Sequence, residues 1–501
     1  MSSNSAQIVH QLHREFQELI EYVIGEQSQK RTAYEVELTL FRRLLALGAA
    51  LLRLFFLHRA STRPRGPVYA PDGTALKYHD QRPTSYFSVF GKVRFHRHYF
   101  HAPGQEGYCP LDAELSLPPR CYSDLLRDWA EYCITNEAYD ESSKVLERIL
   151  GLSVSKRALE SSVQEDAVDV EAFYEQKVVP PLAAEGPILV IQADGKGVPM
   201  IRSQPAPQTA RRGKGEKRTK KKEAVVTAIY SIKPYYRTPQ QVTEALLRDL
   251  TKHKETSSTA NAQPARPAPV GKEVRATLAG KDTAFERLAR RVSQREGPHI
   301  QHRVALTDGA ESLQRQVRDR LSRFTLVLDI IHAVEYLWTA ANALLGETNP
   351  DRIPWVQEQL LHILSGRTSA VIQTLENCVR DPALSDSQCR ALNTTIGYYL
   401  RNLSYMRYDL YLAQGWPIGT GVVEGACGHL VKDRMEHSAM RWTLTGAQAV
   451  LDLRAVRIND DWDAYQLFRR HCQHQRLYDN RPIAIPVAEF FAFSHRAQVS
   501  V

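Results

Sequence analysis

The sequence predicts a multidomain protein of the α/β class, and three observations lead to that prediction. The chain has 501 residues, which at roughly 100–200 residues per domain corresponds to two to four structural units. Short, continuous apolar runs such as 188–191 are typical of buried strands. Long stretches with helical period flank these runs, above all between residues 330 and 412. We therefore expect a sheet together with separate helical regions.

Composition narrows the class of protein. Apolar residues make up 43% of the chain and charged residues 24%, values that exclude a disordered or fibrous protein. The net charge of +9 and the isoelectric point near 9.1 favour a polyanionic partner, because basic surfaces gain affinity by displacing counterions from phosphates. Charge alone does not separate DNA, RNA and membrane headgroups.

Targeting signals and cysteine spacing bear on the compartment. The longest apolar run, 44–57, contains Arg53 and is shorter than the ~20 residues that cross a bilayer. The polar N-terminus lacks the pattern of a signal peptide, so we expect an intracellular protein without a membrane partner. The seven cysteines include no Cys-x-x-Cys pair, which argues against a disulfide framework and a structural zinc and predicts free thiols.

The first part of the chain is expected to be helical, then to form a hairpin. Apolar residues recur at helical spacing over residues 5–58, which predicts two amphipathic helices. Residues 77–100 contain two strand-like patches around Gly91, which predict a β-hairpin. Its basic edge either contacts phosphate or is a solvated edge strand protected by charge.

Two short helices separated by a Gly-containing turn are predicted over residues 142–159. This spacing suits a helix-turn-helix, in which the second helix would present Lys156 and Arg157 to a DNA groove. Plain helical packing is the alternative.

The predicted core contains two strands that end in an Asp-Gly pair. The strand at 188–191 leads to Asp194, and the strand at 303–307 leads to Asp308. Two segments of different composition lie between them. Residues 211–222 are expected to form a flexible basic hairpin tip, and residues 252–281 a disordered or loosely ordered insertion.

A third core strand is predicted over 324–329, and a long helical region follows it up to residue 412. A turn cluster at 416–421 then leads into a helix at 422–437, which carries Glu424 in its first turn.

Each of the three carboxylates has an ordinary structural explanation. Asp-Gly after a strand is a common turn, so Asp194 and Asp308 could be turn residues. Glu424 could complement the helix dipole. Carboxylates crowded at one sheet edge repel each other, however, and in a basic protein such a cluster indicates a bound cation such as Mg²⁺. Two such ions can assist cleavage of a phosphodiester. The order strand Asp, strand Asp, helical insertion, helix Glu therefore favours a metal-dependent nuclease or strand transferase.

Four strings carry a resemblance to a known family: QADGKGV (192–198), ALTDGAE (305–311), LDIIHAVEYLW (328–338) and PIGTGVVEGACGHLVKDRM (417–435). From the hairpin to the C-terminus the chain resembles insertion-sequence transposases of the Kra and Lre type, which are related to Mutator-like transposases. The resemblance implies a ribonuclease H-like core, a mixed sheet flanked by helices with an all-helical insertion. It further implies a DDE triad of Asp194, Asp308 and Glu424 that binds Mg²⁺, or Mn²⁺ as a substitute.

The same resemblance suggests auxiliary residues. Asp329 and His332 match an Asp-x-x-His element that Mutator-like enzymes place near the active site. A helix-capping Asp beside a core His is the alternative. The chain departs from the family in lacking a Cys-x-x-Cys element after the hairpin, which puts a structural zinc further in doubt.

Basic residues after Glu424 are candidates for holding DNA phosphates beside the site, namely Lys432, Arg434 and Arg441. A solvated helix face is the alternative interpretation of all three.

Five regions are predicted from these observations: a helical arm (1–70), a hairpin and helix-turn-helix-like DNA-binding region (71–180), the first part of the core (185–338, with the insertion 252–281), a helical insertion (339–415), and the last part of the core with the Glu helix and C-terminal tail (416–501).

The expected activity is transposition, in which the protein binds the terminal repeats of its element, cleaves by metal-dependent hydrolysis and joins the end to target DNA. Pairing two ends implies a homo-oligomer, and the expected location is the cytoplasm of a bacterium, at the nucleoid. The alternative is a transposase-derived DNA-binding protein that no longer cuts. A tyrosine recombinase would need Arg, His and Tyr in a helical catalytic domain, which the strands ending in Asp disfavour.

Overall fold

The protein forms two compact units in this computed structural model, which describes residues 3–62, 68–70, 73–201, 221–251, 265–437 and 440–478. The first unit combines the described residues up to 173 with those from 462 onward, and the second comprises those of 174–461. The predicted last part of the core, 416–501, is therefore divided between the two units. None of the described helices is long and apolar enough to span a membrane.

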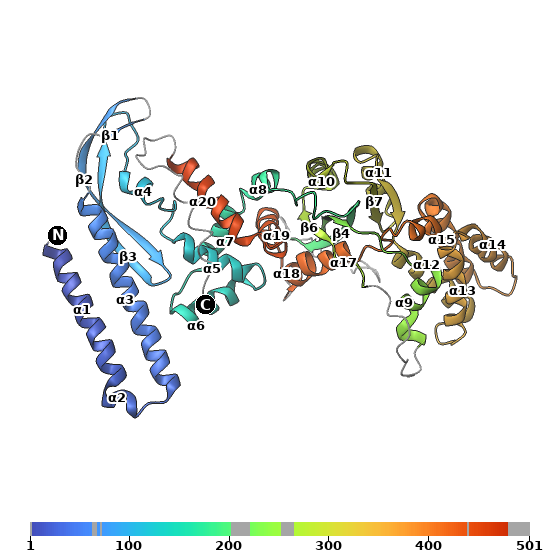
Figure 1. Ribbon diagram of the computed structural model, residues 1–501, viewed down its shortest axis with the longest axis horizontal. Helices are drawn as coiled ribbons and strands as arrows, with labels where there is room; N and C mark the ends of the chain where they lie inside the picture. The colour runs from blue at the N-terminus through green and yellow to red at the C-terminus, as the bar shows by residue number, and fades with distance from the viewer. Residues whose placement is uncertain are drawn as a thin grey trace, which may run out of the picture. The chain divides into compact units, whose positions relative to one another are not determined.

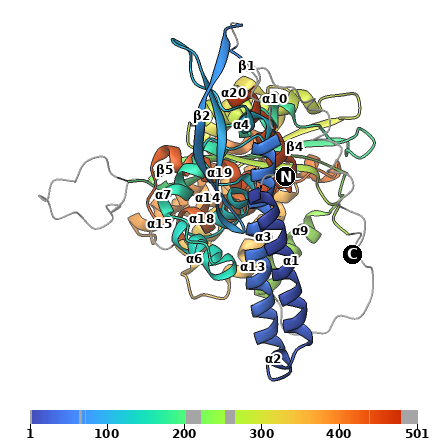
Figure 2. The same cartoon turned by 90° about the vertical axis from the view of Figure 1, so that its left-hand side faces the viewer.

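The first unit begins with a helical arm, made of two long helices joined by a short one. These are α1 (Ser3–Ile24), α2 (Glu26–Gln29) and α3 (Ala33–Thr62). Figures 1 and 2 both show α1 and α3 side by side, with α2 at the tip. The two helices predicted over residues 5–58 are confirmed.

The predicted hairpin is also confirmed. Strands β2 (Ala75–Ser88) and β3 (Gly91–His101) pair antiparallel, and the short β1 (Val68–Tyr69) pairs with β2. Gly91 has a φ of +116°, which a residue with a side chain rarely adopts, so glycine suits this turn. The hairpin packs on α3 through Phe56, whose ring stacks on that of Phe95 at 4.2 Å between centroids.

Helices complete the first unit: α4 (Pro110–Glu114), α5 (Asp124–Ile134), α6 (Tyr139–Leu150), α7 (Lys156–Asp166), the first part of α8 (Val170–Gln176) and α20 (Trp462–Tyr478). The two helices predicted over 142–159 are α6 and α7. Gly151 ends α6 in the left-handed conformation, with φ +69°, and Ser155 caps α7 by accepting a hydrogen bond from the Ala158 amide.

A buried charged network joins α20 to the other helices of this unit. Arg469 is fully buried and donates to Asp166 at 2.9 Å and to Asp124 at 3.0 Å. Arg127 also pairs with Asp166, and the buried Glu131 lies among these charges. A buried charge needs a partner of opposite sign, so the last described helix is part of the core of this unit.

The second unit is built on a five-stranded mixed sheet in the order β6-β5-β4-β7-β8. Its strands are β4 (Ile188–Pro199), β5 (Lys221–Ile232), β6 (Val270–Thr277), β7 (His302–Thr307) and β8 (Thr325–Leu328). Strand β5 runs antiparallel to both β4 and β6, whereas β4, β7 and β8 run parallel. The expected mixed sheet flanked by helices is present.

Helices cover both faces of this sheet. On one face, Leu189 and Ile191 pack against α10 (Lys281–Arg295) and α11 (Glu311–Arg320). On the other face, Ile188 and Val190 pack in one cluster with α9 (Pro239–Thr251) and the helices that follow β8. Successive side chains of a strand point to opposite faces, which explains the continuous apolar run at 188–191.

One prediction about the core needs correction. Residues 252–281 were expected to be a disordered or loosely ordered insertion, but Val270–Thr277 forms the edge strand β6 and pairs with β5. The charged residues of this segment give it no apolar strand pattern in the sequence. Glu273 is nevertheless buried, because it forms an ion pair with Arg291 at 2.9 Å. Residues 252–264 lie outside the described residues, as do residues 211–220 of the expected basic hairpin tip.

The predicted helical insertion is confirmed as helical. It consists of α12 (Ile330–Leu345), α13 (Arg352–Leu364), α14 (Thr368–Val379), α15 (Asp386–Asn402), a 3₁₀ turn (Leu403–Tyr405) and α16 (Tyr408–Ala413). The chain then enters α17 (Gly421–Ala426), a π-helix (Cys427–Lys432) and α18 (Asp433–Met435), and α19 (Leu444–Ile458) packs against β6.

Candidate functional site

Asp194 and Asp308 lie at the same level of two neighbouring parallel strands. Ala193 on β4 is in register with Thr307 on β7, so the two aspartates occupy the next position of each chain. The alternation along β4 places Asp194 on the face that also carries Ile188 and Val190, the face covered by the helical insertion. The register therefore brings together the two acids that the sequence placed on separate strands.

The strand of Asp194 extends further than expected. The sequence suggested that the strand ends at Asp194, but β4 continues to Pro199 because β5 pairs with it along its whole length, from Ile188 with Ile232 to Pro199 with Lys221. Asp194 thus projects from inside a strand, and its backbone is held by pairing rather than by a turn. Its Oδ1 accepts a hydrogen bond from the Gly195 amide at 2.6 Å.

The turn after β7 fixes Asp308. Its Oδ1 accepts from the Ala310 amide at 2.9 Å, and its carbonyl accepts from the Tyr398 hydroxyl at 2.8 Å. Gly309 has a φ of +89°, and an added Cβ would lie 2.8 Å from that hydroxyl, so both the conformation and the space call for glycine. A tyrosine of the helical insertion therefore supports the Asp-Gly turn directly.

A buried glutamine holds the helix of Glu424 against the central strand. Oε1 of Gln192 accepts from the Val423 amide at 2.9 Å, which satisfies one of the free amides at the start of α17. Its Nε2 lies 3.0 Å from the Tyr230 hydroxyl and 3.3 Å from the Gly419 carbonyl. Gln192 thereby joins the turn cluster, the helix and strand β4.

Cys427 makes the second link between this helix and the sheet. Its thiol donates to Oδ2 of Asp194 at 3.2 Å. Burial raises the pKa of Cys427, and the negative charges of Asp194 and Glu424 raise it further, so the thiol stays protonated and acts as a donor. Cys427 begins the π-helix, a widened turn that is rare in proteins and is found mostly near functional sites.

A second group of ligand-type side chains lies beside these acids. One potential ligand atom from each of Asp329, His332 and Glu424 lies within 4.8 Å of the others. Asp329 caps α12 through the Ile331 amide and is fully buried, as the helix-cap alternative anticipated. Its Oδ2 accepts from the Thr420 hydroxyl at 2.7 Å, and that hydroxyl also lies 2.8 Å from Oε1 of Glu424.

Electrostatics tie the cluster together. Burial raises the pKa of Asp329 to about 6, partly offset by the hydrogen bonds from Thr420 and Ile331, while the charge of Glu424 raises it further. Burial lowers the pKa of His332, but the carboxylates of Asp329, Glu335 and Asp308 outweigh that effect and the net direction is upward.

The described residues fit a divalent cation chemically. Buried Asp329 and half-buried Glu424 crowd two carboxylates around one hydroxyl, and a positive charge there would relieve both their repulsion and the burial of Asp329. The group within 4.8 Å contains Glu424 but neither Asp194 nor Asp308. Asp194 is linked to the helix of Glu424 through the Cys427 thiol, and Asp308 follows the strand that pairs with the strand of Asp194.

The basic candidates are placed differently from one another. Lys156 and Arg157 are exposed at the start of α7, and Lys432 and Arg441 are also exposed. The expectation for Arg434 needs correction, because its side chain is fully buried. Its guanidinium lies over the Trp442 ring at 4.8 Å and donates to the Met440 sulfur, so it stabilises the fold and is out of reach of DNA.

Three residues that position the site were not singled out from the sequence: Gln192, Thr420 and Cys427. Gln192 is the polar residue at the end of an otherwise apolar run, a signal that could have marked it. Thr420 lies four residues before Glu424, and this spacing only weakly indicates a contact between the two side chains. Nothing in the sequence indicated the partner of Cys427.

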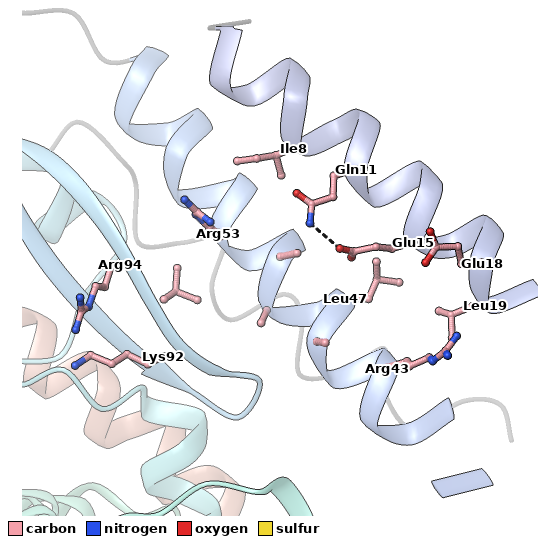
Figure 3. A pocket seen from close by; sticks show the side chains of 14 residues that line it. Ile8, Gln11, Glu15, Glu18, Leu19, Arg43, Leu47, Arg53, Lys92 and Arg94 are labelled. Carbon is pink, nitrogen blue, oxygen red and sulfur yellow. Dashed lines mark hydrogen bonds between the residues drawn. The ribbon is translucent and has the colours of Figure 1, made fainter. Parts of the chain in front are cut away.

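A cavity of about 870 Å³ lies in the first unit, between the helical arm and strand β3. Figure 3 shows Glu15 and Glu18 of α1 on one side and Lys92 and Arg94 of β3 on the other, with α3 between them. Arg43 and Arg53 of α3 line the hollow as well, so basic side chains come from two of its walls. It contains none of the predicted catalytic residues.

Comparison with known proteins adds a partial match. Residues 72–221 match an uncharacterised protein family (UPF0236), and this stretch includes the hairpin, α4 to α8 and strand β4 with Asp194. It is less than a third of the chain. No curated protein matches the chain.

Proposed function

We propose that the protein is a DNA transposase of the DDE class, with Asp194, Asp308 and Glu424 as the acids of its active site. The observation that carries the proposal is the register of β4 with β7, which places Asp194 and Asp308 side by side, together with the attachment of the Glu424 helix to the same strand. These contacts support a single site formed by three acids that are far apart in the sequence, as in a ribonuclease H-like core.

The chemistry expected there is phosphodiester hydrolysis followed by strand transfer. Mg²⁺ or Mn²⁺, held by these carboxylates, would neutralise charge on the attacking and leaving oxygens. Asp194 and Asp308 would supply oxygen ligands from the sheet and the turn that follows it, and Glu424 would supply one from the helix. His332, whose pKa is raised by neighbouring acids, donates a hydrogen bond to a phosphate oxygen. Water attacks phosphorus and the 3′-oxygen leaves. The freed 3′-hydroxyl then attacks a phosphorus of the target DNA, and the 3′-oxygen of the adjoining target nucleotide leaves.

The positive charge of the chain supports DNA as the partner. Exposed Lys156 and Arg157 at the start of α7, and Lys432 and Arg441 near the Glu424 helix, are the proposed phosphate contacts. Because two ends must be paired, the active form is proposed to be a homo-oligomer, working at the nucleoid in a bacterial cytoplasm.

The test is cleavage of labelled duplexes that carry the sequences flanking the gene, with Mg²⁺, Mn²⁺ or EDTA. We expect cleavage with either metal and none with EDTA. Asp308→Asn keeps the size of the side chain and should abolish cleavage, whereas Asp319→Asn, at an exposed position of α11, should not. Tight binding without cleavage under every condition would refute the enzyme and support a DNA-binding protein that no longer cuts.

A further inference from the structure

A second cavity, of about 400 Å³, opens beside the candidate site in the second unit. Its wall is formed by the loop that follows β5, by α9, by the start of α12 and by the turn cluster before α17. Glu424 contributes to the same wall. Whatever occupies this cavity therefore lies next to the proposed active-site acid.

Three cationic side chains line the cavity: Lys233, Arg237 and Arg266. Within the described part of the chain, none of them forms an ion pair with a carboxylate. Arg237 donates through Nη2 to the Trp416 carbonyl at 2.9 Å, but its Nε is buried without a hydrogen-bond partner among the described residues. A guanidinium donates up to five hydrogen bonds, so Arg237 retains free donors beside the cavity.

The charges of this group are unbalanced. Burial lowers the pKa of Arg237, and the positive charge of Arg266 lowers it further. An anion between these two guanidinium groups, of which Arg237 is half-buried, would relieve their repulsion. Arginine pairs with phosphate through two parallel hydrogen bonds, which makes phosphate a natural occupant.

The remainder of the wall is apolar, including Val242, Leu246, Ile331 and Ile418. A free phosphate would leave this surface and most of the 400 Å³ unused, whereas a nucleotide has both an anionic group and a flat, weakly polar ring. The combination of cations at one place and aliphatic side chains elsewhere is typical of a site for an organic anion.

We propose that this cavity binds one nucleotide of a DNA strand, with its phosphate on Arg237, Arg266 and Lys233 and its sugar and base against the apolar wall. This proposal rests on the proposed function, because the DNA strand in question is the one that enters the active site at Glu424. The cavity would then position that DNA strand by binding a phosphate that neighbours the phosphate being cleaved.

Binding of a fluorescent single-stranded oligonucleotide, measured by anisotropy in EDTA over a range of salt concentrations, tests this without any cleavage. Arg237→Gln should weaken binding about tenfold and reduce the slope of log K against log salt by roughly 0.7 for the lost phosphate contact. Lys233→Gln and Arg266→Gln, at exposed positions where folding is not at risk, should shift the slope in the same direction. Arg248→Gln, on the exposed surface of α9, is the matched control.

The outcomes separate this proposal from the function on which it rests. An unchanged slope in all three variants, or no DNA binding by the intact protein, would overturn the nucleotide site. If the slope falls as expected while neither the intact protein nor Asp308→Asn cleaves DNA, the site stands and the transposase proposal fails. If inorganic phosphate protects the intact protein but not Arg237→Gln from thermal unfolding, and DNA binding is the same in both, the cavity holds a free anion and the nucleotide proposal is wrong.

Discussion

The thiol of Cys427 donates a hydrogen bond to the carboxylate of Asp194, across 233 residues of sequence. The contact joins the first turn of the π-helix to the middle of the central strand. Because Cys427 follows Glu424 by three residues on the same helical run, the contact sets the position of one proposed active-site acid relative to another. The raised pKa of the thiol makes Cys427 a positioning residue rather than a nucleophile.

Replacing Cys427 by Ala should lower DNA cleavage about tenfold, since residues that orient metal-binding carboxylates commonly contribute roughly 10- to 100-fold. Cys427→Ser retains a donor and should restore most of the activity. The informative measurement is the Mn²⁺ concentration that gives half-maximal cleavage, which should rise in Cys427→Ala. If only the melting temperature changes, the thiol has a purely structural role.

Thr420 bridges two carboxylates, so removing its hydroxyl should destabilise the second unit. Thr420→Val keeps the shape of the side chain but leaves buried Asp329 short of one hydrogen bond, which costs about 1–3 kcal/mol. Urea unfolding followed by tryptophan fluorescence measures the loss. Thr420→Ser keeps the hydroxyl and serves as the control. Equal stability of the Val variant and the unchanged protein would show that solvent replaces the bond.

The buried Glu131 should make the stability of the first unit depend on pH. Burial raises its pKa well above the ordinary value, and the charge of Asp166 adds to the effect. The folded state therefore holds this proton more tightly than the unfolded state, and stability falls as pH rises above about 4.5 toward the folded pKa. Glu131→Gln removes this dependence.

We expect Glu131→Gln to gain stability relative to the unchanged protein as pH rises from about 4.5 to about 7. Chemical unfolding at several pH values measures the difference. Asp140→Asn, at an exposed position of α6, controls for the loss of one acid. A constant difference between the Gln variant and the unchanged protein across this range would contradict the prediction.

The helical arm leaves many of its large apolar side chains exposed. In the described part of α1 only Leu12 and Leu19 are buried, and in α3 only Phe56. Nine large apolar side chains remain exposed on the two helices, namely Phe16, Ile20, Val23, Ile24, Tyr34, Phe41, Leu44, Leu51 and Phe55. Such a surface marks an interaction site.

The charges of the arm favour a second copy of this chain as the partner. Helix α1 carries three glutamates and one arginine, whereas α3 carries four arginines and two glutamates. In a twofold pairing, α1 of one copy lies against α3 of the other, so opposite charges meet twice.

The unchanged protein should therefore have twice the 56.8 kDa mass of one chain in light scattering after gel filtration. The double variant Phe16→Glu and Ile20→Glu should have the mass of one chain. Val178→Glu changes an exposed apolar residue outside the arm and should remain a dimer. A dimeric arm variant would place the interface elsewhere, and a monomeric unchanged protein would refute the pairing.

The elements that the sequence predicted correctly are those with a clean local pattern. The apolar run at 188–191, the Gly91 turn and the helical period after residue 330 each depend on neighbours in the chain. Asp194 and Asp308 were found because each comes soon after such a run. The register that brings them together depends on pairing between strands, which no local pattern encodes.

The failures have a common physical cause, which is a charged side chain that is buried by its partner. Glu273 has the sequence pattern of a solvent-exposed residue, but Arg291, 18 residues away, neutralises it inside strand β6. Arg434 has the pattern of a DNA contact, but the Trp442 ring covers it. In both places the partner's position, and not the residue type, decides whether a charge faces water.

The participation of α20 in the first unit has a consequence for synthesis of the protein on the ribosome. At ~5–20 residues per second, α20 emerges roughly 15–60 s after residue 173. During this interval the carboxylates of Asp124 and Asp166 lack Arg469, so the first unit can collapse but cannot close its charged interior. The second unit has its whole sequence available earlier. The unit whose synthesis begins first is therefore the one whose folding finishes last, and in the interval its helices remain available to a chaperone.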